Sequence, residues 1–230
     1  MAFGLNIPVI LTADTPHSTA VNKLTLPFAN ALVVSEAIPK RFFENYGVNK
    51  VVLFSGVDEA AWMKDFKPSK KFSFEKPLIV VRQMETKASY ALGKADVTEK
   101  IAQKLTSLGH VLFLPRYGEL KKKGFMVTKE FVDSASLVAS ADIVLSIGGT
   151  ITREAALQGV PSTVISEFGK THVNKYLAEK GFPLFIIDAN DVVAFTKKYL
   201  GRRWDVKEKL GKLENPVKVI EKIIREKQFT

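Results

Sequence analysis

The sequence predicts an α/β protein whose larger, C-terminal part holds a parallel sheet covered by helices on both faces. Three observations indicate this class. From residue 78 onward, short runs of branched apolar residues alternate with amphipathic segments of helical length. The short runs are apolar at nearly every position, as strands buried on both faces are. Several amphipathic segments begin at a capping residue or end at a glycine, as helices do.

The strands expected in the larger part are the apolar runs at 78–81, 111–115, 142–147, 160–166 and 183–188. The helices expected around them have apolar residues at helical spacing and occupy 96–109, 133–141, 151–158, 171–181, 191–201 and 215–227. The last helix has Asn215 as its cap and Pro216 at its first helical position. Strands that alternate with helices in this way are typical of a parallel sheet.

A smaller and incomplete α/β lobe precedes this part. Strands are expected at 7–12, 31–35 and 50–56, with helical segments at 18–26 and 38–47. The lobe holds about half of the elements of a nucleotide-binding type of domain. The segment 63–77 is charged, has two prolines and lacks periodicity, so it is interpreted as a linker. The chain is therefore divided into a domain of residues 1–70 and a domain of residues 71–230.

The composition excludes several kinds of site. The chain has 230 residues and no cysteine, which excludes disulfides, thiolate metal ligands and a cysteine nucleophile. The three histidines are far apart and have no metal-ligand spacing, so no metal site is expected. No apolar run has the length of a membrane span and no basic segment precedes the first apolar stretch, which predicts a cytoplasmic protein.

The formal net charge of +10 favours anionic partners, namely nucleotides, nucleic acid or an anionic membrane surface. Solvated basic faces are the alternative interpretation of the same charge. No basic motif with interleaved aromatic residues is present, so a specific nucleic-acid partner is not expected.

Two glycines and a threonine, Gly148, Gly149 and Thr150, separate the expected strand 142–147 from the helix that follows. Glycines at this place allow a sharp turn and a close approach of a ligand to the backbone. Thr150 is expected to cap the helix, whose free N–H groups favour an anion. The segment thus predicts a phosphate-binding turn, although it matches neither the P-loop nor the dinucleotide fingerprint. A tight turn without a ligand is the alternative.

Glu154 lies one helical turn beyond this threonine. A carboxylate there can accept hydrogen bonds from the two hydroxyls of a ribose, so Glu154 is a candidate ligand of a nucleotide. The neighbouring Arg153 is expected to point elsewhere, because adjacent helical residues do not share a face. A purely structural role for Glu154, with the helix dipole or with a residue one turn away, stays open.

Two arginines follow strands of the same expected sheet. Arg82 comes at the end of the run 78–81 and Arg116 follows the run 111–115, so both are expected at the carboxyl edge beside the glycine turn. The planar guanidinium group suits phosphate. Ser89, in the loop after Arg82, is a further candidate donor. The alternative is that both arginines are simply exposed at strand ends.

Asp14 and His17 follow the first expected strand. Histidine suits general acid or base catalysis near neutral pH, and Asp14 could orient it. Both are expected to face an interdomain cleft as catalytic residues. An Asx turn at Asp14 and a histidine at a helix start are the structural alternative.

The segment GGTITREAALQGVP resembles the nucleotide-sugar motif in the C-terminal domain of GT-B glycosyltransferases and of the nonhydrolysing UDP-N-acetylglucosamine 2-epimerase. Together with AFGLNIP, DTPHSTAVNKLTLPFA and SEAIP it resembles the domain-of-unknown-function 354 family of the same superfamily. The resemblance runs from about residue 2 to 190.

This resemblance implies a GT-B-like protein whose Rossmann-like C-terminal domain binds a nucleotide sugar such as a UDP-sugar. The N-terminal, acceptor-side domain would be truncated relative to the family and would be completed by a homodimer or a partner chain. The implied activity is a metal-independent, nucleotide-sugar-dependent glycosyl transfer without a further cofactor. An epimerase on the same scaffold and a non-catalytic nucleotide-sugar-binding subunit are the alternatives.

Overall fold

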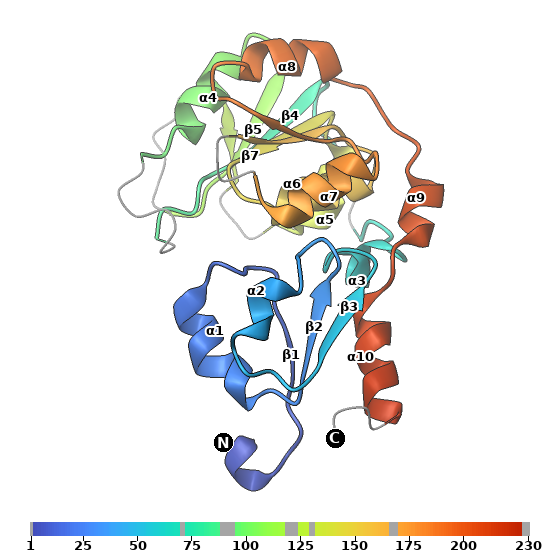
Figure 1. The fold of residues 1–230 in the computed structure, drawn as a ribbon. Coiled ribbons are helices and arrows are strands. Elements are labelled where there is room, and N and C mark those ends of the chain that lie inside the picture. The colour runs from blue at the N-terminus through green and yellow to red at the C-terminus, as the bar shows by residue number, and fades with distance from the viewer. Residues whose placement is uncertain are drawn as a thin grey trace. The chain divides into compact units, whose positions relative to one another are not determined.

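Figure 1 shows the computed structural model of the chain. It describes residues 2–69, 72–87, 95–117, 124–128, 132–165 and 170–226. The chain forms two compact units, Met1–Lys64 together with Glu208–Thr230, and Asp65–Lys207. The first boundary falls a few residues before the division expected near residue 70. The C-terminal segment, expected in the larger domain, instead belongs to the first unit.

The first unit holds a three-stranded parallel sheet in the order β1-β2-β3. Its strands are β1 (Ile10–Thr12), β2 (Ala31–Ser35) and β3 (Val51–Phe54). Its helices are η1 (Phe3–Leu5), α1 (Thr19–Thr25), η2 (Leu26–Phe28), α2 (Arg41–Glu44), α3 (Ala60–Met63) and α10 (Pro216–Arg225). Strand β2 is buried along its whole length, as expected for a strand with neighbours on both sides.

The amphipathic pattern of α10 explains why it joins this unit. Its apolar stripe packs on the sheet, where Ile223 forms a core cluster with Val33 and Phe54. The expected cap is confirmed, since the side chain of Asn215 accepts a hydrogen bond from the Val217 amide at 2.9 Å. The segment before α10 is tied to β3, because the Glu214 amide donates to the Ser55 carbonyl at 2.7 Å.

The second unit holds a six-stranded sheet in which every neighbouring pair is parallel, in the order β6-β5-β4-β7-β8-β9. The strands are β4 (Leu78–Arg82), β5 (His110–Leu114), β6 (Met126–Val127), β7 (Ile143–Ser146), β8 (Ser162–Ile165) and β9 (Leu184–Ile187). The helices are α4 (Thr98–Leu105), α5 (Ser134–Ser140), α6 (Thr150–Leu157), α7 (His172–Glu179) and α8 (Val192–Tyr199), and α9 (Lys207–Lys212) spans the return to the first unit. Neither β6 nor α9 was expected from the sequence.

Alternate residues of each strand pack on opposite faces of this sheet. One face includes Ile79, Val81 and Phe113 and is covered by Ile101 and Leu105 of α4 and by α8. The other face carries Leu78, Val80 and Leu112 and is covered by α5 and α6. Figure 1 shows α4 and α8 on one side of the sheet and α5 and α6 on the other. Two apolar faces therefore account for the nearly continuous apolar runs of the sequence.

The strand order places a switch point in the middle of this sheet. From β4 the chain moves outward through β5 to β6, and it then returns to the other side of β4 to form β7, β8 and β9. Ligands of open α/β sheets bind outside the carboxyl ends of the strands at such a point. The fold is Rossmann-like, and it directs attention to the ends of β4 and β7.

Candidate functional site

The register of the sheet aligns three residues at this edge. Arg82, the last residue of β4, pairs with Leu114 of β5 on one side and with Ser146 of β7 on the other. Since side chains alternate along a strand, Arg82 shares the face of Leu78 and Val80, which is the face covered by α5 and α6. The sequence pattern thus sends one arginine to the switch point on a defined face.

A cavity of about 540 Å³ lies at these strand ends. Its lining includes five of the residues expected to bind a nucleotide sugar, Arg82, Arg116, Gly148, Thr150 and Glu154. The volume lies in the range of small-molecule sites, roughly 300–1,000 Å³. All of its lining residues belong to the second unit.

Arg82 is half-buried in this lining. Its Nη1 donates to the Pro115 carbonyl at 3.4 Å, a long and weak hydrogen bond. Burial lowers the pKa of Arg82 from its usual value, the nearby charge of Arg116 lowers it further, and Glu85 raises it in part. Burial leaves less water around the Arg82 guanidinium, so an added anion would stabilise its charge.

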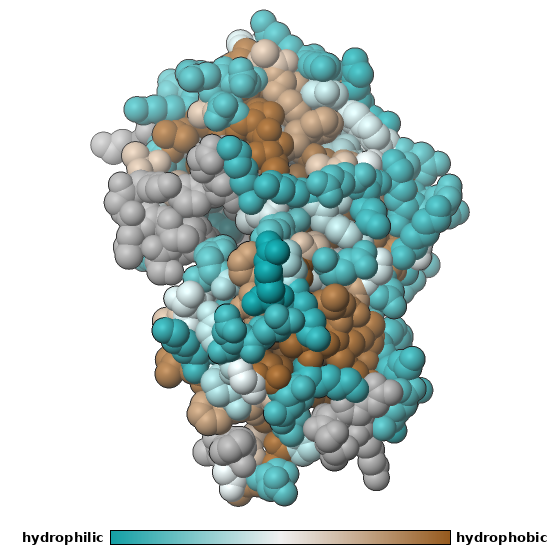
Figure 2. Space-filling view, viewed as in Figure 1, coloured by the Kyte–Doolittle hydropathy of each residue, from teal (hydrophilic) through white to brown (hydrophobic). Residues whose placement is uncertain are grey.

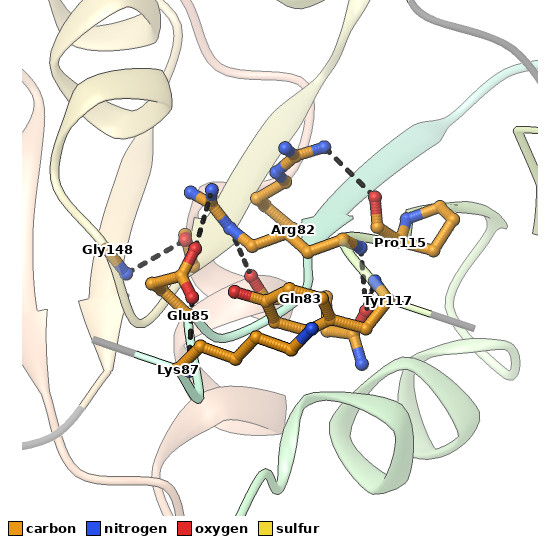
Figure 3. Close-up of polar contacts among 9 residues, drawn as sticks. Arg82, Gln83, Glu85, Lys87, Pro115, Tyr117 and Gly148 are labelled. Atoms are coloured by element: carbon orange, nitrogen blue, oxygen red, sulfur yellow. Dashed lines mark hydrogen bonds and ion pairs between the residues drawn. The ribbon is translucent and has the colours of Figure 1, made fainter. Parts of the chain in front are cut away.

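Arg116 makes three contacts with Gln83 and Glu85, which Figure 3 labels. Its Nη1 lies 3.3 Å from Glu85 Oε2. Its Nε donates to the Gln83 carbonyl at 3.2 Å, and its amide donates to Gln83 Oε1 at 2.7 Å. Gln83 Oε1 also accepts from the amide of Tyr117 at 3.1 Å, so one buried glutamine joins the end of β4 to the loop after β5.

The turn before α6 differs in detail from the expected phosphate-binding turn. Gly149, not Thr150, occupies the cap position, and no side chain caps the helix. Neither Gly148 nor Gly149 has a positive φ, so the turn does not need their conformational freedom. The Gly148 amide donates to Ser146 Oγ at 3.0 Å and is already satisfied. The amides of the first helical turn, from Thr150 on, have no carbonyl one turn earlier in the helix and can serve an anion.

Gly149 has a packing role that the sequence did not indicate. A Cβ atom at this position would lie 3.1 Å from Cζ of Arg153. The Arg153 side chain was expected to point elsewhere than Glu154, and it is in fact buried beside the turn, outside the lining of the cavity. The glycine therefore makes room for a folded-back arginine.

Glu154 lies in the cavity wall and is only 5% exposed. Its Oε2 accepts a hydrogen bond from Ser134 Oγ at 2.8 Å. Ser134 is the first residue of α5, and the cap of that helix is Asp133, whose side chain accepts from the Ser136 amide at 3.2 Å. Two helices thus cooperate to direct one carboxylate into the cavity.

The remaining candidates lie elsewhere. Asp14 and His17 are both exposed in the loop after β1 of the first unit, where Thr15 Oγ1 donates to Asp14 at 2.6 Å. Their pairing and their catalytic role stay predictions. Ser89 lies outside the described residues.

Among the residues at this site that the sequence did not single out are Gln83, Glu85 and Ser134. The first two follow Arg82 directly in RQMET, and their place after a strand end was the available signal. Nothing in the sequence around Ser134 indicated that it would meet Glu154. Over the described ranges, no group of three or more histidine, aspartate or glutamate side chains is placed to hold a metal ion. In the same part of the chain, no helix is long and apolar enough to cross a membrane.

The model of the family described as "Protein of unknown function (DUF354)" matches residues 1–228. The chain belongs to this family. A DUF354 relative of similar sequence, the uncharacterized protein MJ0665 of Methanocaldococcus jannaschii, is 32% identical over 233 aligned residues, which cover 94% of this chain and 67% of that protein.

Solved structures similar to this DUF354 chain include several glycosyltransferases. The spinosyn forosaminyltransferase SpnP has a TM-score of 0.58 at 14% identity and is matched over 99% of this chain and 72% of its own. SsfS6 of Streptomyces sp. SF2575, solved with thymidine diphosphate, has a TM-score of 0.55 at 20% identity, over 97% and 65%. SnogD of Streptomyces nogalater has a TM-score of 0.55 at 12% identity, over 97% and 74%. The DUF354 chain thus has a glycosyltransferase-like GT-B fold.

Proposed function

We propose that this DUF354 chain binds a nucleoside diphosphate sugar in the cavity of the second unit and transfers its glycosyl group without a metal ion. One observation carries the proposal: Arg82, Arg116 and the first turn of α6 all line the switch-point cavity. Arginine side chains and helix N-termini are the groups that proteins use for phosphate. The GT-B fold, shared with glycosyltransferases, supports the same ligand class.

The diphosphate is the part of the ligand that the arginines would hold. Burial removes part of the water around the Arg82 guanidinium, and a phosphate would compensate for that loss. In glycosyl transfer the bond between the anomeric carbon and the diphosphate oxygen breaks, and negative charge develops on that oxygen. Two guanidinium groups and helix amides would stabilise this charge in the transition state, the role that a metal ion fills in other enzymes.

The ribose would contact Glu154. Its Oε2 accepts from Ser134, which fixes the side chain in the cavity wall.

We assign proton removal from the acceptor hydroxyl to His17 of the first unit, oriented by Asp14. In glycosyl transfer the acceptor oxygen attacks the anomeric carbon, its proton passes to a base, and the nucleoside diphosphate leaves. Replacing His17 with asparagine should abolish transfer and leave nucleotide affinity unchanged, because the nucleotide contacts lie in the second unit.

Titration calorimetry with UDP, dTDP and GDP tests the binding step. Arg82→Gln should weaken the binding of the tightest of these ligands by about 1.5–3 kcal/mol, the usual value of a hydrogen bond to a charged group. The wild-type affinity should fall as salt rises, because salt screens charge pairs. Arg225→Gln, at an exposed position of α10, is the matched control and should change nothing. The absence of binding for all three nucleotides would refute the proposal.

Turnover distinguishes the remaining alternatives. Release of the nucleoside diphosphate only when an acceptor is present supports transfer. Conversion of the donor to an isomer with the diphosphate still attached would instead identify an epimerase. Binding without either reaction would identify a nucleotide-sugar-binding subunit.

A further inference from the structure

The cavity has an unexpected charge balance. The chain carries a formal net charge of +10, yet the charged side chains of the cavity wall, among the described residues, are two arginines and two glutamates. A site built only to maximise affinity for a diphosphate would not place a carboxylate beside its arginines. Glu154 has a role in the proposed function, whereas Glu85 does not.

Glu85 is fixed in position on both of its oxygens (Figure 3). Its Oε1 accepts from the Lys87 amide at 3.1 Å, which closes a tight turn in the loop after β4. Its Oε2 lies 3.3 Å from Nη1 of Arg116. The side chains of Glu85 and Arg116 are 27% and 33% exposed, so water screens the attraction between their charges only in part.

Glu85 acts on both arginines. It pairs directly with Arg116, and its charge also raises the pKa of Arg82, against the larger effects of burial and of Arg116. Its carboxylate thus reduces the repulsion between the two guanidinium groups. The same carboxylate repels any anion that comes to lie between them, and the repulsion grows with the charge of that anion.

We infer that Glu85 is a specificity-determining residue that disfavours the free nucleoside diphosphate relative to its sugar ester. This inference rests on the proposed function. The free diphosphate has a terminal phosphate with a second ionisation near pH 6, so at pH 8 it carries about one more negative charge than the ester. The extra charge lies on the phosphate that the arginines hold. Glu85 therefore lowers the affinity for the product of the transfer, the free diphosphate, more than the affinity for the donor. This difference limits product inhibition.

The test compares two ligands on two proteins. The probes are whichever of UDP, dTDP and GDP binds best to the wild type, and the glucose ester of that nucleotide. Titration calorimetry at pH 8 and low salt measures both affinities for the wild type and for Glu85→Gln. We expect the substitution to raise the affinity for the free diphosphate on the order of tenfold and that for the ester only about threefold. The reason is that the phosphate held by the arginines carries about twice the charge in the free diphosphate.

Glu179→Gln is the matched control. It removes one negative charge of the same unit from an exposed position at the last residue of α7, and that end of the helix lies on the amino side of the parallel sheet. It should leave the ratio of the two affinities unchanged. Circular dichroism and thermal unfolding should show that both variants fold as the wild type does.

The outcomes separate the inference from the proposed function. If Glu85→Gln changes both affinities by the same factor, or changes neither, the inference is overturned and nucleotide binding stands. Weaker binding of the free diphosphate in the variant would also overturn it, because Glu85 would then act mainly by positioning Arg116. If the wild type binds neither probe, the proposed function fails as well.

Discussion

Ser134 Oγ lies 2.8 Å from Glu154 Oε2, and this hydrogen bond joins the first turn of α5 to the buried face of α6. Glu154 is only 5% exposed, so its carboxylate needs such a partner to stay fixed in the cavity wall. The pair connects the packing of two helices to the residue proposed to meet the ribose.

Replacing Ser134 with alanine should weaken nucleotide binding by about 0.5–1.5 kcal/mol, the net value of one hydrogen bond, because Glu154 loses the group that orients it. Glu154→Ala should weaken binding more, by about 1–3 kcal/mol, since the ligand then loses its acceptor. Titration calorimetry measures both. Ser140→Ala, at the last residue of the same helix, is the control and should match the wild type. Equal affinity in the wild type, Ser134→Ala and Glu154→Ala would return the glutamate to a structural role.

Alanine at the two glycines of the turn should separate stability from binding. A Cβ atom at Gly149 would crowd the Arg153 guanidinium, so Gly149→Ala should lower the free energy of unfolding by about 1 kcal/mol, a typical cost of overpacking. At Gly148 the nearest atom to an added Cβ is 3.8 Å away and the residue lines the cavity. Gly148→Ala should therefore keep the stability and weaken nucleotide binding. Thermal unfolding and calorimetry on both variants check this, and the opposite pattern would contradict the geometry.

Asp133 should give the second unit a stability that depends on pH. The pKa of Asp133 lies below its usual value, mainly because of the Ser136 hydroxyl, which donates to it at 2.6 Å. The ionised form is thus favoured in the folded state. The stability that the ionised Asp133 carboxylate gives to the folded state is fully present above the pKa of aspartate in the unfolded chain, about 4. It is lost as pH falls through the lower pKa of the folded state.

Asp133→Ala should therefore lower the free energy of unfolding by about 1 kcal/mol at pH 7, as the loss of a helix cap does, and by less near pH 3. Asp133→Asn, which caps as well as aspartate, is the control at pH 7. Denaturant unfolding of the three proteins at both pH values measures the difference. A loss that is as large at pH 3 as at pH 7 would show that ionisation plays no part.

Gly159 should tolerate no side chain. It has a φ of 74°, and an added Cβ would lie 2.1 Å from the carbonyl oxygen of Trp204. Gly159→Ala should destabilise the second unit by more than about 3 kcal/mol, because the backbone itself must move. Gly201 has a similar φ of 76° but no atom within 4 Å of an added Cβ, so Gly201→Ala reports the strain alone. Similar melting temperatures for the two variants would refute the packing argument.

The first unit should self-associate. Leu24 of α1 is 74% exposed and Leu53 of β3 is 45% exposed, and Figure 2 shows apolar surface on this unit in the region of β3. Exposed apolar side chains and strand edges favour pairing with a second copy. Light scattering should detect species larger than one chain, and Leu53→Lys should reduce them. A monodisperse monomer at high concentration would contradict this expectation.

The sequence by itself determined the architecture of the second unit. Apolar runs at 78–81 and 142–147 predicted buried parallel strands, and they formed β4 and β7, because a strand covered on both faces needs apolar residues at every position. The same reasoning placed Arg82, Arg116 and the turn at Gly148 on one edge, since parallel strands end together. It failed for short elements such as β6, whose two residues carry no periodic signal.

Only the tertiary structure decided which residues meet across the chain. From the sequence, α10 was assigned to the larger domain, whereas it packs on the sheet of the first unit. Its apolar stripe shows that it packs on a sheet, but the sequence does not show on which one. The contacts of Gln83 with Arg116, of Ser134 with Glu154 and of Gly159 with Trp204 could not be predicted from the sequence either. Local propensity follows from neighbours in sequence, whereas these contacts depend on the register of strands and the placement of helices, which are set by the packing of the whole unit.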